Sequence, residues 1–148
     1  MKGKLIWSIF WALVGVFVIV ISMIAIPRPL WPLGFPPAIF LSAIVVFVLL
    51  GVALLFLTVK TKVAGILKKF LLLTGASAVG LPVFVLLHNA IYGLFIHFFG
   101  ADFWDRTGIG DEPFFFFMAV FICPIAFLVG VAGSVVLTIK SKQVKHSI

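Results

Sequence analysis

Four long apolar stretches without Asp, Glu, Lys or Arg organise the chain, and polar or proline-rich segments separate them. Such stretches predict helices that cross a membrane, because a helix rises about 1.5 Å per residue and the hydrocarbon core is about 30 Å thick. We therefore predict an all-α integral membrane protein with four transmembrane helices, at about residues 5–26, 38–59, 70–98 and 113–139. The third stretch is longer than a membrane requires, so we expect it to tilt, kink or project.

The amino-acid composition indicates the same class of protein. Of the 148 residues, 64% are hydrophobic and 10% are charged, and a water-soluble domain could not cover that much apolar surface. A signal peptide would also begin with basic residues and an apolar stretch, but this stretch is longer and ends without a small-residue cleavage site. The single cysteine excludes an intramolecular disulfide.

Charged residues are divided unevenly among the segments that flank the four stretches. Every Lys precedes the first stretch, separates the second from the third, or follows the fourth, whereas both Arg and all four acidic residues lie in the other two connectors. Because Lys accumulates on the cytoplasmic side, we predict one domain over residues 1–148, an up-down-up-down bundle with both termini cytoplasmic. We expect it in the plasma (inner) membrane of a prokaryote, with its Lys residues against anionic lipid headgroups. This placement explains the formal charge of +7 without a nucleic-acid partner.

The third stretch contains a polar sequence that lipid does not suit, His88-Asn89-Ala90-Ile91-Tyr92, with the single Asn and the single Tyr of the chain. Helical periodicity places His88 and Tyr92 on one face with Asn89 to one side, and polar side chains exposed to lipid are costly. Counting from the expected helix ends puts Cys123 at the depth of His88. We therefore predict an intramembrane polar site formed by His88, Asn89, Tyr92 and Cys123.

This predicted polar site has three interpretations. The favoured one is structural, in which its side chains form hydrogen bonds between helices. The second is functional, in which His88 titrates or contacts a solute that Asn89 and Tyr92 orient. The third is metal or haem ligation, and haem is disfavoured because His88 and His97 lie on opposite faces of one helix.

Small residues and prolines predict how the third and fourth helices meet. Small side chains allow close approach of helices in a membrane, and counting from the helix ends puts Ser77 level with Ser134. Pro82 and Pro124 should kink their helices, because proline lacks an N–H and frees the carbonyl four residues earlier. The expected packing residues are Ser77, Gly80, Gly130 and Ser134.

The connector at about residues 100–112 contains every acidic residue of the chain. His97, Asp102 and Asp105 are candidate metal ligands, since carboxylates with one imidazole suit several divalent ions. The spacing matches no EF-hand loop, so we favour solvated loop charges and assign no cofactor. Asp111-Glu112-Pro113 is typical of a helix start, with acids at the positive end of the helix dipole.

These patterns favour a non-enzymatic membrane protein that acts as a homo-oligomer or as an accessory subunit of a membrane complex. An enzyme is disfavoured because we expect no buried carboxylate and find no Ser with an evident base. The alternative is a small solute or ion channel or transporter with its polar site at His88, Asn89 and Tyr92. The third class is a membrane enzyme or a metal-binding protein.

Overall fold

A computed structural model describes residues 2–25 and 37–146, and these residues form helices joined by short connections. The described residues contain no strand. Four helical runs are long and apolar enough to cross a membrane, and they match the four stretches that the sequence predicts, apart from residue 26, which lies outside the described residues. The elements are α1 (Lys2–Ala25), α2 (Pro37–Lys60), α3 (Gly65–Phe99), α4 (Phe103–Thr107), α5 (Pro113–Phe117), η2 (Met118–Ile122) and α6 (Cys123–His146).

Two helices are longer than the sequence predicts. Helix α3 begins at Gly65 instead of Phe70, so Lys68 and Lys69 lie inside the helix and the connection after α2 shortens to residues 61–64. The last run continues to His146 instead of 139. We placed the helix ends at the first charged residues beyond each apolar stretch. Lys is a good helix former, so the helices continue through these positions.

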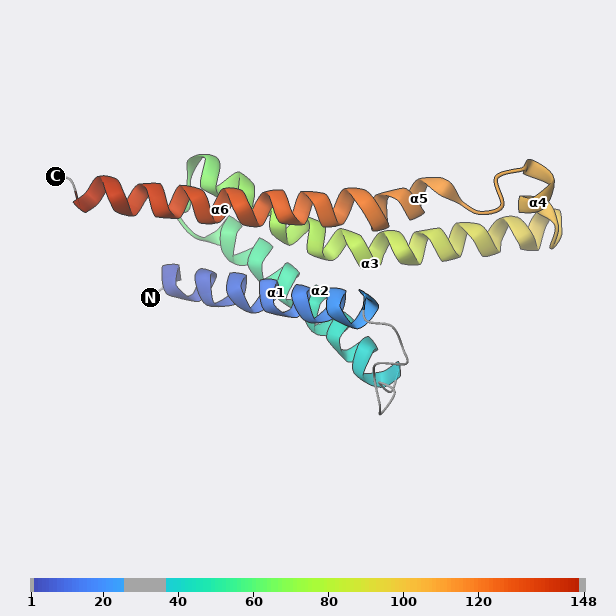
Figure 1. Cartoon of the computed structure of the whole chain (residues 1–148), viewed down its shortest axis with the longest axis horizontal. Helices are drawn as coiled ribbons and strands as arrows, with labels where there is room; N and C mark the ends of the chain where they lie inside the picture. Colours follow the sequence, from blue (N-terminus) through green and yellow to red (C-terminus); the bar gives the residue numbers. More distant parts are fainter. Residues whose placement is uncertain (1, 26–36, 147–148) are drawn as a thin grey trace.

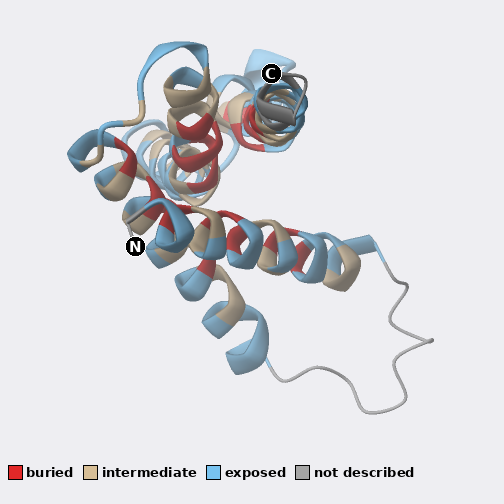
Figure 2. Cartoon of the chain, turned by 90° about the vertical axis from the view of Figure 1, so that its left-hand side faces the viewer, coloured by how far each residue is buried: buried red, intermediate tan, exposed pale blue. Residues whose placement is uncertain are grey.

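Figure 1 shows α3 and α6 side by side and antiparallel along much of their length. Helix α2 packs against the first half of α3 and crosses it obliquely, and α1 packs against α2. The start of α1, the end of α6 and the turn at 61–64 lie at one end of the molecule, which we call the Lys end, and α4 lies at the other. Buried residues are concentrated where the four long helices meet (Figure 2).

Three phenylalanines from different helices form the centre of the core. The ring of Phe17 in α1 stacks on Phe127 of α6 with centroids 4.3 Å apart, and Phe47 of α2 lies 6.0 Å from Phe17 and 5.8 Å from Phe127. Around them each helix buries one narrow stripe at helical spacing, such as Ile6, Phe10 and Leu13 in α1. The remaining faces are apolar and exposed, as expected for helices in contact with lipid.

Glycines set the closest contacts between helices. A Cβ at Gly130 of α6 would lie 2.5 Å from Thr74 Oγ1 and 2.8 Å from the Thr74 backbone nitrogen of α3. A Cβ at Gly133 would lie 2.5 Å from the ring of Phe70. The backbones of α3 and α6 therefore approach each other more closely than any other residue at position 130 would allow.

The buried residues of α3 all precede Pro82, and Pro82 itself lies inside a continuous helix. Beyond Pro82 the helix exposes large apolar side chains, including Leu86 at 69% and Phe98 at 70%. We call residues 82–99 the distal half of α3. In the fourth run, the five-residue π-helical turn η2 directly precedes Cys123 and Pro124, and Cys123 N–H bonds to the carbonyl of Met118, five residues earlier. π turns are rare, and they occur mostly as single turns inside α-helices, where they can bend the helix.

We predict that Gly130→Ala destabilises the fold by about 1–3 kcal/mol, because the new methyl group meets the backbone of α3. Thermal unfolding of the purified protein in detergent measures the effect. Gly15→Ala is the matched control, since nothing lies within 4 Å of a Cβ at Gly15. Equal unfolding temperatures for the two variants would contradict the close contact.

Candidate functional site

The site is built around His88, which α3 places against the segment that precedes α5. His88 Nδ1 lies 3.1 Å from the backbone carbonyl oxygen of Glu112 and 3.4 Å from its carboxylate Oε2. A carbonyl oxygen only accepts hydrogen bonds, so Nδ1 donates and must carry the hydrogen. His88 Nε2 lies 3.7 Å from Asp111 Oδ1. The imidazole therefore contacts two carboxylates, one at each nitrogen.

Glu112 is the N-cap residue of α5 and a buried carboxylate, with 7% of its side chain exposed. Its two oxygens accept the backbone N–H groups of Phe114 and Phe115, at 2.8 and 2.9 Å. Its own N–H donates to Asp111 Oδ1 at 2.7 Å. This arrangement satisfies two of the free N–H groups of the first helical turn and places a carboxylate at the positive end of the helix.

Trp104 of α4 covers the site from the side of the connector. Its indole stacks on Tyr92 with centroids 5.7 Å apart and planes 7° apart, and its Nε1–H donates to the Tyr92 carbonyl at 3.2 Å. Trp104 is 8% exposed. These contacts fold the connector back along α3, so α5 begins beside His88 and not beyond the end of α3.

A second pair of charges lies in the first half of the connector, next to the end of α3. Arg106 Nη2 donates to the carbonyl of Phe99 at 2.7 Å, and its Nε lies 3.1 Å from Asp102 Oδ2. Both side chains are more than half exposed. Arg106 thus supplies a hydrogen bond to a carbonyl at the end of α3, where the helix itself offers no donor.

The predicted polar site is brought together only in part. His88 and Tyr92 lie side by side with ring centroids 6.4 Å apart. Asn89 is exposed on another face of α3, where its Nδ2 donates to the Val85 carbonyl at 2.8 Å. Cys123 lies elsewhere, because its sulfur faces Gly80, 3.4 Å from where a Cβ would be. Gly80 precedes His88 by eight residues, about 12 Å along the helix.

The predicted depths are therefore wrong for both pairs. His88 is level with Phe116, whose ring lies 5.6 Å away, and not with Cys123. Ser134 follows Gly133, which contacts Phe70, so it lies about two turns from the level of Ser77. Counting from the helix ends assumed that both helices end in one plane, whereas α5 begins partway along α3. The Ser134 hydroxyl is buried and makes no hydrogen bond within the described residues.

Two further expectations concern the acidic residues, and the first of them is wrong. We expected no buried carboxylate, and Glu112 is one. Of the candidate metal ligands, His97 is exposed, Asp102 pairs with Arg106, and Asp105 is exposed. In the part of the chain that the structure describes, no three His, Cys, Asp or Glu side chains are grouped to hold a metal ion.

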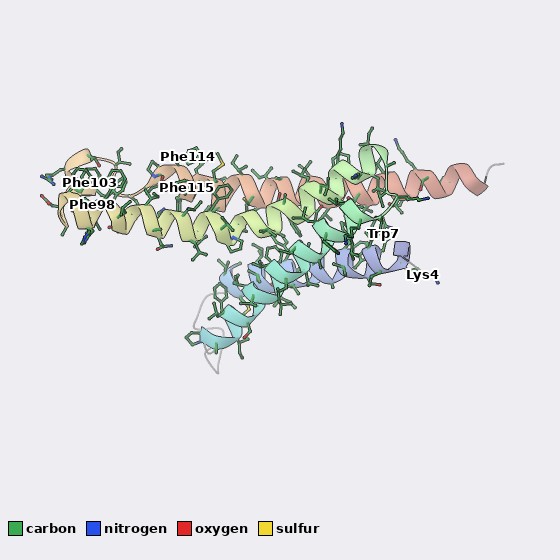
Figure 3. The ribbon with its side chains drawn as sticks, turned by 180° about the vertical axis from the view of Figure 1, so that it is seen from behind. Lys4, Trp7, Phe98, Phe103, Phe114 and Phe115 are labelled. Atoms are coloured by element: carbon green, nitrogen blue, oxygen red, sulfur yellow. The ribbon has the colours of Figure 1, made fainter. Side chains whose placement is uncertain are left out.

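Trp104 and the contacts of Asp111 and Glu112 with His88 were not predicted from the sequence. A signal was present for the acids, because a polar His in an apolar helix needs a partner and all carboxylates lie in one connector. Trp104 offered no such signal, since its burial depends on how the connector folds. Figure 3 shows Phe98 and Phe103 at this end of the molecule, in the aromatic surroundings of the connector.

Comparisons with models of protein families, with curated proteins and with solved structures give no match. The fold therefore defines the class: an all-helical chain, over the residues described, with four helices long and apolar enough to cross a membrane.

We predict that Glu112→Ala lowers stability by about 1–2 kcal/mol, because the variant leaves the N–H groups of Phe114 and Phe115 without acceptors. Hydrogen exchange should show faster exchange at these two amides, with a lower unfolding temperature. Asp105→Ala is the matched control, since it removes an exposed carboxylate from the same connector. Unchanged protection of both amides in Glu112→Ala would refute the capping role.

Proposed function

We propose that this chain is a non-enzymatic integral membrane protein that associates with further membrane helices, as a homo-oligomer or as a small subunit of a larger complex. The observation that supports this proposal is an exposed face on the distal half of α3. This association face combines polar and small residues within a helix that is otherwise suited to lipid. It consists of Leu86, Asn89, Ala90, Gly93 and His97.

The association face is continuous, because at 100° per residue its members fall within an arc of about 100°. Asn89 uses one amide hydrogen on the Val85 carbonyl, which leaves its Oδ1 and a second hydrogen for another chain. Nothing lies within 4 Å of a Cβ at Gly93. Polar side chains facing lipid are unfavourable, whereas Asn, His and Gly are favourable at contacts between membrane helices.

The orientation that we propose follows from the distribution of charge. Lys4, Lys60, Lys62 and Lys140 belong to the Lys end of the molecule, whereas all four acidic residues lie between positions 102 and 112. On the positive-inside rule the Lys end faces the cytoplasm and both termini lie there. We propose the plasma (inner) membrane of a prokaryote as the location, with anionic headgroups as partners of the Lys end.

We predict that Gly93→Leu weakens self-association at least several-fold, because its side chain blocks the approach of a second helix while leaving the single chain unchanged. Energy transfer between donor-labelled and acceptor-labelled protein in lipid vesicles measures the association. Gly15→Leu is the matched control, because Gly15 is equally open and lies on α1. Loss of energy transfer with Gly15→Leu but not with Gly93→Leu would assign the contact to α1 and reject the proposed face.

The second candidate function is a small solute or ion pathway that uses His88. The observation that favours it is the imidazole between two carboxylates, since Nε2 faces Asp111 and Nδ1 faces Glu112. Because Nδ1 carries a hydrogen and Nε2 faces a carboxylate, the cluster places a hydrogen-bond donor and several acceptors side by side, as a pathway for a proton requires.

For this second function we predict that His88→Leu abolishes proton flux into vesicles while self-association is retained. A pH-sensitive dye inside the vesicles reports the flux under an imposed gradient. Ser42→Leu is the control, because it removes an exposed polar side chain from α2, outside both the carboxylate contacts and the association face. Flux no greater than that of protein-free vesicles, or flux unchanged in His88→Leu, would eliminate this candidate.

A further inference from the structure

A groove lies between the first turns of α1 and the last turns of α6, at the Lys end of the molecule. It encloses about 680 Å³, within the range of about 300–1,000 Å³ that is typical of ligand sites. The residues of its lining that matter here are Lys4, Trp7, Ser8, Trp11, Thr138 and Ile139. Lys4 and Trp7 lie at the end of the molecule opposite Phe98 and Phe103 (Figure 3).

The apolar wall of the groove is held in place by the core. Trp7 and Trp11 meet the buried ring of Phe10 edge to face, with centroids 5.0 and 5.4 Å away. Deeper along the same two helices, Phe17 stacks on Phe127 at 4.3 Å and brings α1 and α6 together. The groove is therefore open near the helix ends and closed toward the middle, as an inserted hydrocarbon chain requires.

The polar lining residues have defined hydrogen-bonding capacity. The Ser8 hydroxyl donates to the Lys4 carbonyl at 3.1 Å, and the Thr138 hydroxyl donates to the Ser134 carbonyl at 2.8 Å. Their oxygens therefore remain free to accept a hydrogen bond. Lys4 supplies positive charge, and every acidic side chain of the protein lies between positions 102 and 112, at the far end of the molecule.

We propose that this groove binds an anionic glycerophospholipid with a hydroxylated headgroup. Lys4 attracts the phosphate, Ser8 and Thr138 accept hydrogen bonds from the headgroup hydroxyls, and an acyl chain lies along Trp7, Trp11 and Ile139. Basic pockets between helices at a membrane surface bind anionic headgroups, and tryptophan is favoured at that depth. The inference rests on the proposed membrane placement of the Lys end, but the groove is separate from the association face of α3, so a failure to bind lipid leaves the proposed association untouched.

The test is native mass spectrometry of the full chain in detergent, titrated with dioleoyl-phosphatidylglycerol or dioleoyl-phosphatidylcholine. We expect one tightly retained phosphatidylglycerol and weaker retention of phosphatidylcholine. Lys4→Gln should weaken phosphatidylglycerol binding roughly five-fold, the effect of about one interfacial Lys. Lys62→Gln, which removes the same charge from the exposed turn outside the groove, should leave it within about two-fold of the wild-type value.

A steric variant tests the groove without changing its charge. Ser8→Trp should fill the groove and abolish retention of phosphatidylglycerol, whereas Ile19→Trp, at an exposed position of α1 outside the lining, should not. Unfolding temperatures identify any variant that fails to fold. If a steric variant fails to fold, the comparison of Lys4→Gln with Lys62→Gln tests the groove, and if a charge variant fails, the comparison of Ser8→Trp with Ile19→Trp tests it. Equal retention of the two lipids would overturn the proposed selectivity for an anionic headgroup. Equal losses in Lys4→Gln and Lys62→Gln would overturn the groove as the site, in favour of diffuse electrostatic attraction.

Discussion

The close approach of α3 and α6 at Gly130 is the contact on which the rest of the structure depends. Both helices are apolar on nearly every face, so burial alone does not select how they align, since lipid covers any exposed face equally well. A contact between backbones does select it, because a Cβ at Gly130 would lie 2.8 Å from the Thr74 nitrogen. From that point the antiparallel helices bring Cys123 to Gly80 and Phe116 to His88. The position of the polar cluster is thus a consequence of a glycine contact at the other end of the helix pair.

The four membrane-length helices could be predicted from the sequence because length and the absence of charge determine which segments suit lipid. Their relative depth could not, because it depends on contacts between residues far apart in the chain. Trp104 stacks on Tyr92 and folds the connector back along α3, so α5 begins at the level of His88. A count from the helix ends treats the connector as a simple turn. It therefore assigns the wrong relative depth to every pair of residues on α3 and the fourth run. The early start of α3 was missed for a different reason, since Lys68 and Lys69 mark a change of charge but favour helix.

The sequence indicated that the polar residues need hydrogen-bonding partners, but it did not indicate which residues those partners are. Asp111 and Glu112 were expected to begin a helix, and Glu112 does cap α5 through Phe114 and Phe115. The same carboxylate also contacts His88, so one buried group satisfies a helix terminus and an imidazole together. Asn89 is the next residue after His88, yet the rotation of 100° per residue separates their surroundings. Neighbouring polar residues in a membrane helix therefore need not belong to one site.

The compact connector has a consequence for how the chain enters a membrane. On the proposed orientation, residues 100–112 must pass through the bilayer during synthesis, and they contain four acidic side chains and one Arg. Transfer of an isolated charge into hydrocarbon is costly. In the folded hairpin, Asp102 pairs with Arg106, and Asp111 and Glu112 contact His88. A hairpin of α3 and α5 that forms before translocation would carry three of its four carboxylates already partnered, so the two last long helices are suited to insertion as one unit.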